Sequence, residues 1–334
     1  NNNGGSRNSA FGREALYSNS TSDNSAFGYR ALFANTIGTD NTAVGRSALQ
    51  TNTTGSYNTA VGRTALYSNT IGTNNSAFGF YALSSNTTGN SNVAVGLYAL
   101  SNNTIGANNV ALGTQALLSN TTGSKNIAVG RDALRNNTIG DRNCAFGYAS
   151  LYNNTTGNSN IAIGNDALEK NTTADNNIAI GTSVLNKNTV GSRNTAVGVG
   201  ALNNNVSGSV NNAFGYLALT NSTASENNAF GHQALTNNTT GTLNSAFGHN
   251  ALSANIIGSG NTAMGYAALG SNLSENNTAI GLRSLQFNSS GSNNASLGKE
   301  SLDHNTTGSG NTAVGAIALF ANTTGSNNTA MGLG

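Results

Sequence analysis

An Ala-apolar-Gly triplet recurs along the chain and constrains its fold more than any other feature. The triplet glycines are spaced by 17 residues, with three steps of 16, and twenty triplets extend from Asn8 to the end of the sequence. Self-similarity at one fixed period is typical of solenoids, in which each repeat packs mainly against its neighbours. No linker or change of composition interrupts the period, so we expect residues 1–334 to form a single repetitive domain with repeats starting near Asn8.

One repeat reads Asn-x-Ala-φ-Gly-x-x-Ala-Leu-x-x-Asn-Thr-(Thr/Ile)-Gly-Ser-x, where φ is an apolar residue, as in residues 58–74. Asn opens all twenty copies, and Ala stands two residues later in every copy except the one that carries Ser296. Differences in length fall at the Asn-Thr-Thr-Gly segment. Because insertions and deletions are tolerated in surface connections, this segment is predicted to be a turn.

The composition argues against helices. The chain contains 61 Asn and 42 Gly among 334 residues, and both residue types destabilise helix interiors, as do Ser and Thr, whose short side chains compete for backbone hydrogen bonds. We therefore predict an all-β fold: a parallel β-solenoid of about twenty 17-residue rungs, each with two or three short strands joined by tight corners.

Stacked rungs place identical residues above one another in ladders. Ala and Leu are expected to fill a narrow interior, and Asn side chains can hydrogen-bond to their copies, which satisfies buried amides. Glycines such as Gly45 and Gly55 would permit corners with positive φ. The predicted structural Asn ladder comprises Asn41, Asn58, Asn75, Asn92, Asn109 and Asn126, and the predicted core Leu ladder comprises Leu49, Leu66, Leu83, Leu100 and Leu117.

The Ala-φ and Ala-Leu pairs are adjacent apolar residues. Side chains alternate between the two faces of a strand, so a straight strand cannot bury both members of a pair in one core. Two interpretations remain open. One is a corner residue folded over the rung, and the other is an apolar stripe that is buried against another chain.

The residues that carry most enzymatic chemistry are sparse. The net charge is +2 and no basic run occurs, which predicts no nucleic-acid partner, and no apolar stretch approaches the roughly 20 residues that span a bilayer, which predicts no membrane insertion. Cys144 is the single cysteine. His232 and His249 share a repeat position, but no Cys or carboxylate recurs beside them. We therefore predict no catalytic, cofactor or metal site, and a protein that is not an enzyme.

Two sets of residues are candidates for binding or modification. The position after the triplet glycine carries Tyr29, Arg46, Arg63, Arg131, Tyr148 and Tyr216, which would form a stripe suited to surface glycans or a partner protein, or simply a tolerant solvated face. Asn-x-Ser/Thr triplets at Asn52, Asn86, Asn120 and Asn154 are candidate glycan acceptors, although an Asn- and Thr-rich chain generates such triplets in any case.

The repeat resembles known families. Asn followed by Ala43-Val44-Gly45, or by Ile178-Ala179-Ile180-Gly181, resembles the head repeats of trimeric autotransporter adhesins, whose usual repeat is shorter. The whole unit is similar to Asn-Thr-Ala-Val-Gly tandem repeats of bacterial surface and phage tail-fibre-like proteins, and residues 55–60 resemble the core of curli fibre subunits. These resemblances imply an extracellular or cell-surface β-solenoid that self-associates as a homo-oligomer or filament.

Repetition also indicates the class of function. A mechanical shaft needs many equivalent rungs, whereas a catalytic site needs one irregular constellation, and none breaks the period. We expect a structural subunit of an extracellular fibre or adhesive surface filament, assembled by oligomerisation or end-to-end stacking. The alternatives are a repetitive-surface module that binds polysaccharide or ice, and a phage tail-fibre shaft.

Overall fold

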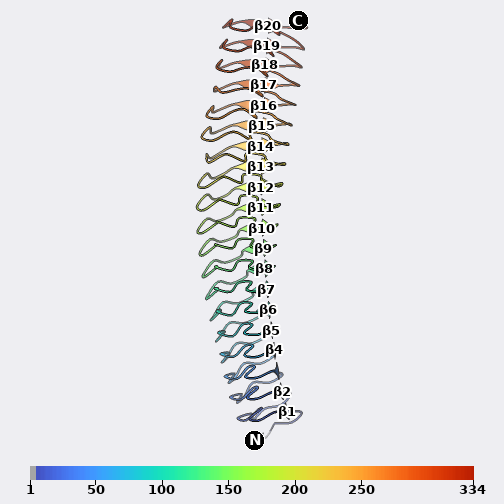
Figure 1. The fold of residues 1–334 in the computed structure, drawn as a ribbon, viewed down its shortest axis with the longest axis vertical. Coiled ribbons are helices and arrows are strands. Elements are labelled where there is room, and N and C mark those ends of the chain that lie inside the picture. Colours follow the sequence, from blue (N-terminus) through green and yellow to red (C-terminus); the bar gives the residue numbers. More distant parts are fainter. Residues whose placement is uncertain (1–4) are drawn as a thin grey trace. The chain divides into compact units, whose positions relative to one another are not determined.

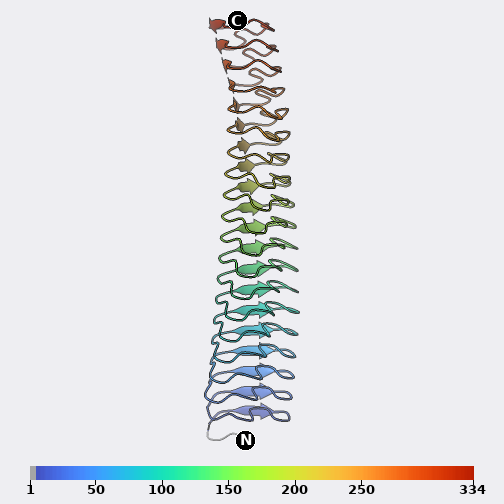
Figure 2. The same cartoon turned by 90° about the vertical axis from the view of Figure 1, so that its left-hand side faces the viewer.

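The computed structural model describes residues 5–334, and these residues form an all-β, parallel β-solenoid, as the repeat predicts. Contacts divide the described residues into two compact units, one that ends at Thr173 and one that spans Ala174–Gly334. Within each unit successive rungs stack on one another (Figures 1 and 2). The described residues include no helix that is long and apolar enough to cross a membrane.

In the first unit, each rung contributes one three-residue strand. Neighbouring strands are parallel and pair identical repeat positions, as Ala43 of one rung pairs with Ala60 of the next. The strands are β1 (Ser9–Phe11), β2 (Ser25–Phe27), β3 (Thr42–Val44), β4 (Thr59–Val61), β5 (Ser76–Phe78), β6 (Val93–Val95), β7 (Val110–Leu112), β8 (Ile127–Val129), β9 (Cys144–Phe146) and β10 (Ile161–Ile163).

The second unit has the same construction. Ala196 pairs with Ala213 in parallel register, and the pattern continues from rung to rung. Its strands are β11 (Ile178–Ile180), β12 (Thr195–Val197), β13 (Asn212–Phe214), β14 (Asn228–Phe230), β15 (Ser245–Phe247), β16 (Thr262–Met264), β17 (Thr278–Ile280), β18 (Ala295–Leu297), β19 (Thr312–Val314) and β20 (Thr329–Met331).

The prediction of two or three strands per rung is wrong, because the rest of each rung is not extended. Left-handed residues with φ near +55° recur at three positions of the repeat, for example Ser47 (59°), Leu49 (50°) and Tyr57 (60°). Such a residue cannot continue a β-strand. The rungs are still joined there by backbone hydrogen bonds, since Leu49 N–H donates to the Ala65 carbonyl at 3.0 Å and Thr53 N–H to the Thr70 carbonyl at 2.9 Å.

The left-handed leucine also explains the adjacent apolar pairs. In β3, Ala43 faces the core and is fully buried, whereas Val44 faces outward and is 37% exposed. Ala48 and Leu49 are both fully buried, because φ of +50° at Leu49 turns the chain and keeps consecutive side chains on one side. The predicted core leucines Leu49, Leu66, Leu83, Leu100 and Leu117 are all fully buried.

The predicted Asn ladder forms a continuous column of buried amides. Asn58 donates to Asn41 Oδ1 from its backbone N–H at 3.0 Å and from Nδ2 at 3.2 Å, and Nδ2 also donates to the Gly72 carbonyl at 2.8 Å. The same bonds from the backbone N–H and Nδ2 to the preceding Oδ1 continue through Asn75, Asn92, Asn109 and Asn126. Each rung is therefore bonded to its neighbours by side chains as well as by the backbone.

Two glycines of the repeat are required for different reasons. Gly62, in the triplet, has φ of +136°, and a Cβ there would lie 2.4 Å from the Gly79 carbonyl oxygen. Gly45 likewise has positive φ, at +129°, as predicted. Gly55 does not belong to the positive-φ glycines, contrary to the prediction. It is needed for space, because a Cβ would lie 2.3 Å from the Gly72 carbonyl oxygen.

Candidate functional surface

The first and third residues of every strand form the outer sheet face of each unit. No charged residue occupies either position in any of the twenty strands of residues 5–334. The third position is always apolar and partly exposed, with Phe78 at 40%, Val95 at 39% and Leu112 at 36%. A neutral, flat column with exposed apolar side chains is the most distinctive surface of each unit.

In the first unit, the predicted binding stripe forms separate clusters. The Arg46 guanidinium lies 5.9 Å from the Tyr29 ring centroid, and Arg131 lies 5.9 Å from that of Tyr148. Arg63 lies 5.6 Å from the ring centroid of Phe80. Leu97 and Thr114 occupy the intervening rungs. The stacking brings stripe residues together in pairs, and the cation covers one face of each ring.

In the second unit the same repeat position carries a run of four aromatic rings. Tyr216 stacks on His232 with centroids 5.2 Å apart, His232 lies 4.7 Å from His249, and His249 lies 5.3 Å from Tyr266. Beside this run, Phe230 of the sheet face stacks between its copies in β13 and β15 at 4.8 and 4.9 Å. The three phenylalanines are nearly parallel, so Phe230 leaves mainly its edge to a ligand, whereas His232 and His249 are tilted by 57° and His249 meets Tyr266 edge-on.

The four candidate glycan acceptors are not accessible in the folded chain. Asn52, Asn86, Asn120 and Asn154 are fully buried and form a second Asn ladder inside the corner. Asn52 Nδ2, for example, donates to Asn35 Oδ1 and to the Gly55 carbonyl, both at 2.8 Å. The nitrogen that a glycan would need is already bonded, so the structure corrects this expectation. The Asn-x-Ser/Thr triplet is a local sequence pattern and gives no information about whether its Asn side chain is buried.

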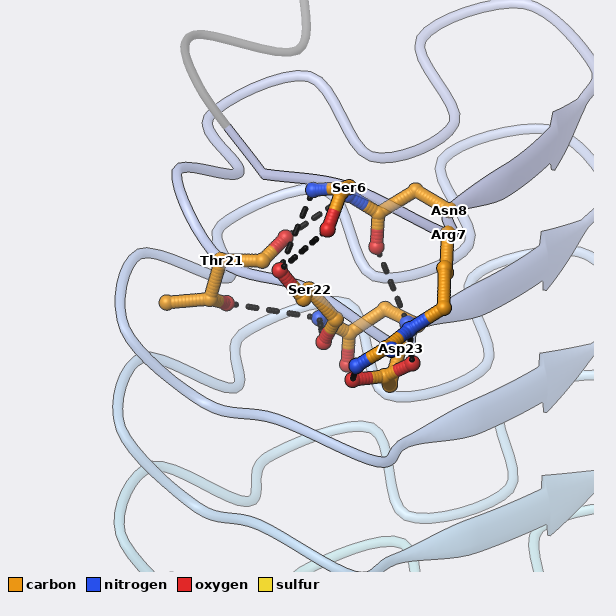
Figure 3. A network of polar contacts seen from close by, with 7 residues as sticks. Ser6, Arg7, Asn8, Thr21, Ser22 and Asp23 are labelled. Carbon is orange, nitrogen blue, oxygen red and sulfur yellow. Dashed lines mark hydrogen bonds and ion pairs between the residues drawn. The ribbon is translucent and has the colours of Figure 1, made fainter.

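Near the start of the first unit, polar side chains join the first two rungs (Figure 3). Arg7 donates from Nε and Nη2 to the two carboxylate oxygens of Asp23 at 2.6 and 2.7 Å, and the backbone N–H of Ser6 donates to Ser22 Oγ at 3.1 Å. The Arg7 guanidinium lowers the pKa of the Asp23 carboxyl. These hydrogen bonds and the ion pair join the first rung to the second, so we assign these side chains a role in holding the two rungs together.

Several buried polar groups were not predicted. The Asp303 side chain is 6% exposed, with Oδ2 3.2 Å from His304 Nδ1 and Oδ1 without a hydrogen-bond partner. In the core, the hydroxyl of Ser284 donates to Ser296 Oγ at 2.8 Å, and Ser296 and Ser301 also share a hydrogen bond. Each of these serines stands at a position where the repeat has alanine. These three substitutions in neighbouring rungs are the sequence feature that could have predicted a buried hydroxyl cluster.

The described residues hold no group of three or more His, Cys, Asp or Glu side chains that could bind a metal ion. A surface hollow of about 360 Å³ in the first unit is lined by hydroxyl-bearing residues, namely Thr64, Tyr67, Ser68, Tyr81, Ser84 and Ser85. These six side chains include no carboxylate, imidazole or amine, so the hollow presents hydroxyl groups that can donate or accept hydrogen bonds.

No protein-family model matches the sequence, and no curated protein is significantly similar to it.

Proposed function

We propose that the chain is a structural subunit of an extracellular fibre or adhesive surface filament. The observation that carries this proposal is that the most regular side chains bond one rung to the next. Asn58 bonds to Asn41 in one ladder, and Asn52 bonds to Asn35 in the other. Asn side-chain hydrogen bonds between nearly all neighbouring rungs would strengthen the shaft of a fibre along its length. The extracellular or surface location rests on the resemblance of the repeat to surface-protein repeats.

We further propose that a second copy of the chain covers the outer sheet face. Ten strands about 4.8 Å apart and about 10 Å long give a flat area of roughly 480 Å² per unit. Pairing one unit with its copy would bury about 1,000 Å² in total, which is near the lower limit for a specific interface, and pairing both units would double that area. A second copy presents ladders with the same spacing, so its side chains can interdigitate over every rung.

Cryo-electron microscopy and sedimentation of the 334-residue chain over a range of concentrations test this proposal. We expect lateral oligomers or filaments with an axial repeat near 4.8 Å. Lysines at Val95 and Leu112, on the sheet face, should raise the concentration needed for assembly at least tenfold. Lysines at Leu97 and Thr114, two residues further along the same rungs and off that face, should have little effect.

Dispersed single chains at every concentration would contradict assembly. Equal effects of the two double variants would contradict the sheet face as the interface while leaving assembly itself intact. A phage tail-fibre shaft would use the same architecture and assembly.

The binding-module alternatives have less support. Arg46 and Arg131 each cover one face of the Tyr29 or Tyr148 ring, and that face is not free to stack on a polysaccharide. In the corner that could present threonines to ice, the Thr53 hydroxyl donates to the Thr70 carbonyl at 3.0 Å. Glycan-array binding and thermal hysteresis measure these two activities directly.

A further inference from the structure

We propose that His232 and His249 together bind one divalent transition-metal ion. The two residues follow the triplet glycines of adjacent rungs, so that one glycine separates each from the end of β14 or β15, and both residues are exposed. Their ring centroids lie 4.7 Å apart, with the ring planes tilted by 57°. This proposal is independent of fibre formation.

The separation of the rings matches that of two imidazoles on one ion. A metal–nitrogen bond of about 2.0–2.1 Å places each ring centroid about 3.2 Å from the metal. Two such rings have centroids about 4.5 Å apart at a right angle and about 5.2 Å apart at the tetrahedral angle. The observed 4.7 Å lies between these values. The tilt matters too, because parallel rings such as Phe230 and Phe247, at 3°, cannot both contain one ion in their planes.

The imidazole nitrogens of this pair are not used elsewhere in the protein. Neither His232 nor His249 makes a side-chain hydrogen bond or ion pair with another residue of the described chain, 5–334. His304 differs, since its Nδ1 lies 3.2 Å from the Asp303 carboxylate. Unbonded imidazole nitrogens can donate their lone pairs to a metal without breaking an existing interaction.

The backbone and the flanking rings hold the pair in place. The carbonyls of His232 and His249 accept backbone hydrogen bonds from Asn250 and Ala267 of the following rungs, both at 3.0 Å. Tyr216 packs on one side of the pair at 5.2 Å, and Tyr266 on the other at 5.3 Å. Because the solenoid sets the rung spacing, the two rings are neighbours before an ion binds, which reduces the entropy that is lost on binding.

The donor set selects the class of metal. Imidazole suits Zn(II), Cu(II) and Ni(II), and Cu(II) is the tightest binder in this series. Ca²⁺ and Mg²⁺ require several oxygen ligands and should not bind here. Two protein ligands leave further coordination positions for water or an added ligand.

Titration of the 334-residue chain with Cu(II), followed by calorimetry and electron paramagnetic resonance, tests the site. The double variant His232→Gln/His249→Gln measures background binding. We expect one ion per chain above this background, with a spectrum that indicates two imidazole nitrogens. Either single substitution should weaken binding at least tenfold, because chelation by two ligands is lost. His304→Gln is the matched control and should leave the affinity unchanged.

Asn165 and Thr182 occupy the repeat position of His232 in other rungs, so a polar glutamine is compatible with the fold. Two equal and independent sites, each removed by one substitution with no change in the affinity of the other, would overturn the shared site. Loss of binding in His304→Gln to the same extent as in His249→Gln would overturn it as well.

Discussion

Ser222 lies one rung beyond Asn205 in the second Asn ladder, and the Oδ1 atom of Asn205 is buried without a hydrogen-bond partner. In an ordinary rung the next Asn donates to this oxygen, as Asn205 Nδ2 does to Asn188 Oδ1 at 2.9 Å. The Ser222 hydroxyl instead lies 3.3 Å from Asn238 Nδ2, as an acceptor. One substitution therefore interrupts a ladder that is otherwise continuous in neighbouring rungs.

Ser222→Asn should repair this ladder. The new Nδ2 can donate to Asn205 Oδ1, and the satisfied buried acceptor should stabilise the fold by about 1 kcal/mol. The thermal unfolding midpoint measures the change, with an increase expected. Asn already fits a 16-residue rung, since Asn272 occupies this position in another one and donates to the Ser274 carbonyl at 2.7 Å.

The reverse substitution, Asn272→Ser, is the control for Ser222→Asn and should lower the midpoint. A lower midpoint for Ser222→Asn would mean that the shortened corner, rather than the missing donor, determines the stability of that rung.

Two glycines in one rung, both with positive φ, differ in the atoms that an added Cβ would meet. Gly198 has φ of +123°, and a Cβ there would lie 2.5 Å from the Gly215 carbonyl oxygen. Gly200 has φ of +67°, and its nearest obstacle is the terminal methyl carbon of Leu217 at 2.7 Å. Ala149 and Ala267 occupy the repeat position of Gly200 in other rungs with φ of 50° and 52°.

Gly198→Ala should therefore destabilise the chain by about 3 kcal/mol or more, because backbone atoms of the next rung must move. Gly200→Ala should cost about 1 kcal/mol or less, since only a flexible side-chain end must shift. Denaturant titration followed by circular dichroism measures both. Equal losses would show that the triplet glycine is not selected by contact with the next rung.

The period predicted the parallel register and the Asn ladder, because a constant spacing with length changes in one corner leaves few other arrangements. It did not predict the left-handed conformation of Leu49, with φ of 50°. Leucine has no intrinsic preference for this region, so stacking between rungs imposes it. The burial of Asn52 was missed for a related reason: its triplet is local, whereas its hydrogen bonds are made to another rung.

Val210, like Leu49, has a left-handed backbone conformation, and this conformation strains a valine. It has φ of +61° and its side chain is 42% exposed, so packing compensates only partly for the unfavourable backbone. The left-handed region is especially unfavourable for a β-branched residue, whereas Asn tolerates it. Asn276 occupies the same repeat position with φ of 58°.

Val210→Asn should raise stability by about 1 kcal/mol, because the strain is relieved. The backbone N–H of Val210 donates to the Ser192 carbonyl at 3.1 Å, and this bond is retained in the variant. Asn276→Val in the same unit should lower stability by a similar amount. Thermal unfolding of the two variants checks the pair, and changes of the same sign would contradict strain as the cause.

The carboxyl groups of Asp303 and Glu14 should make the free energy of unfolding depend on pH with opposite signs. Burial raises the pKa of Asp303, although nearby His304 partly opposes the shift. A hydrogen bond from Arg30 lowers the pKa of Glu14. The folded state thus binds the Asp303 proton more tightly than the unfolded state does, and the Glu14 proton less tightly.

Asp303 therefore favours folding most at a pH below the usual carboxyl pKa, and this advantage is lost as the pH rises through its raised folded pKa. Asp303→Asn should stabilise the chain by about 1 kcal/mol at pH 7, since a buried and partly unsatisfied charge is removed, and the gain should shrink towards pH 3. Glu14→Gln should do the opposite: the variant loses stability at pH 7, and the loss fades as the pH falls through the lowered pKa of Glu14. Unfolding midpoints from pH 3 to 8 measure both trends. A gain for Asp303→Asn that does not vary with pH would show that side-chain packing, rather than the buried charge, is responsible.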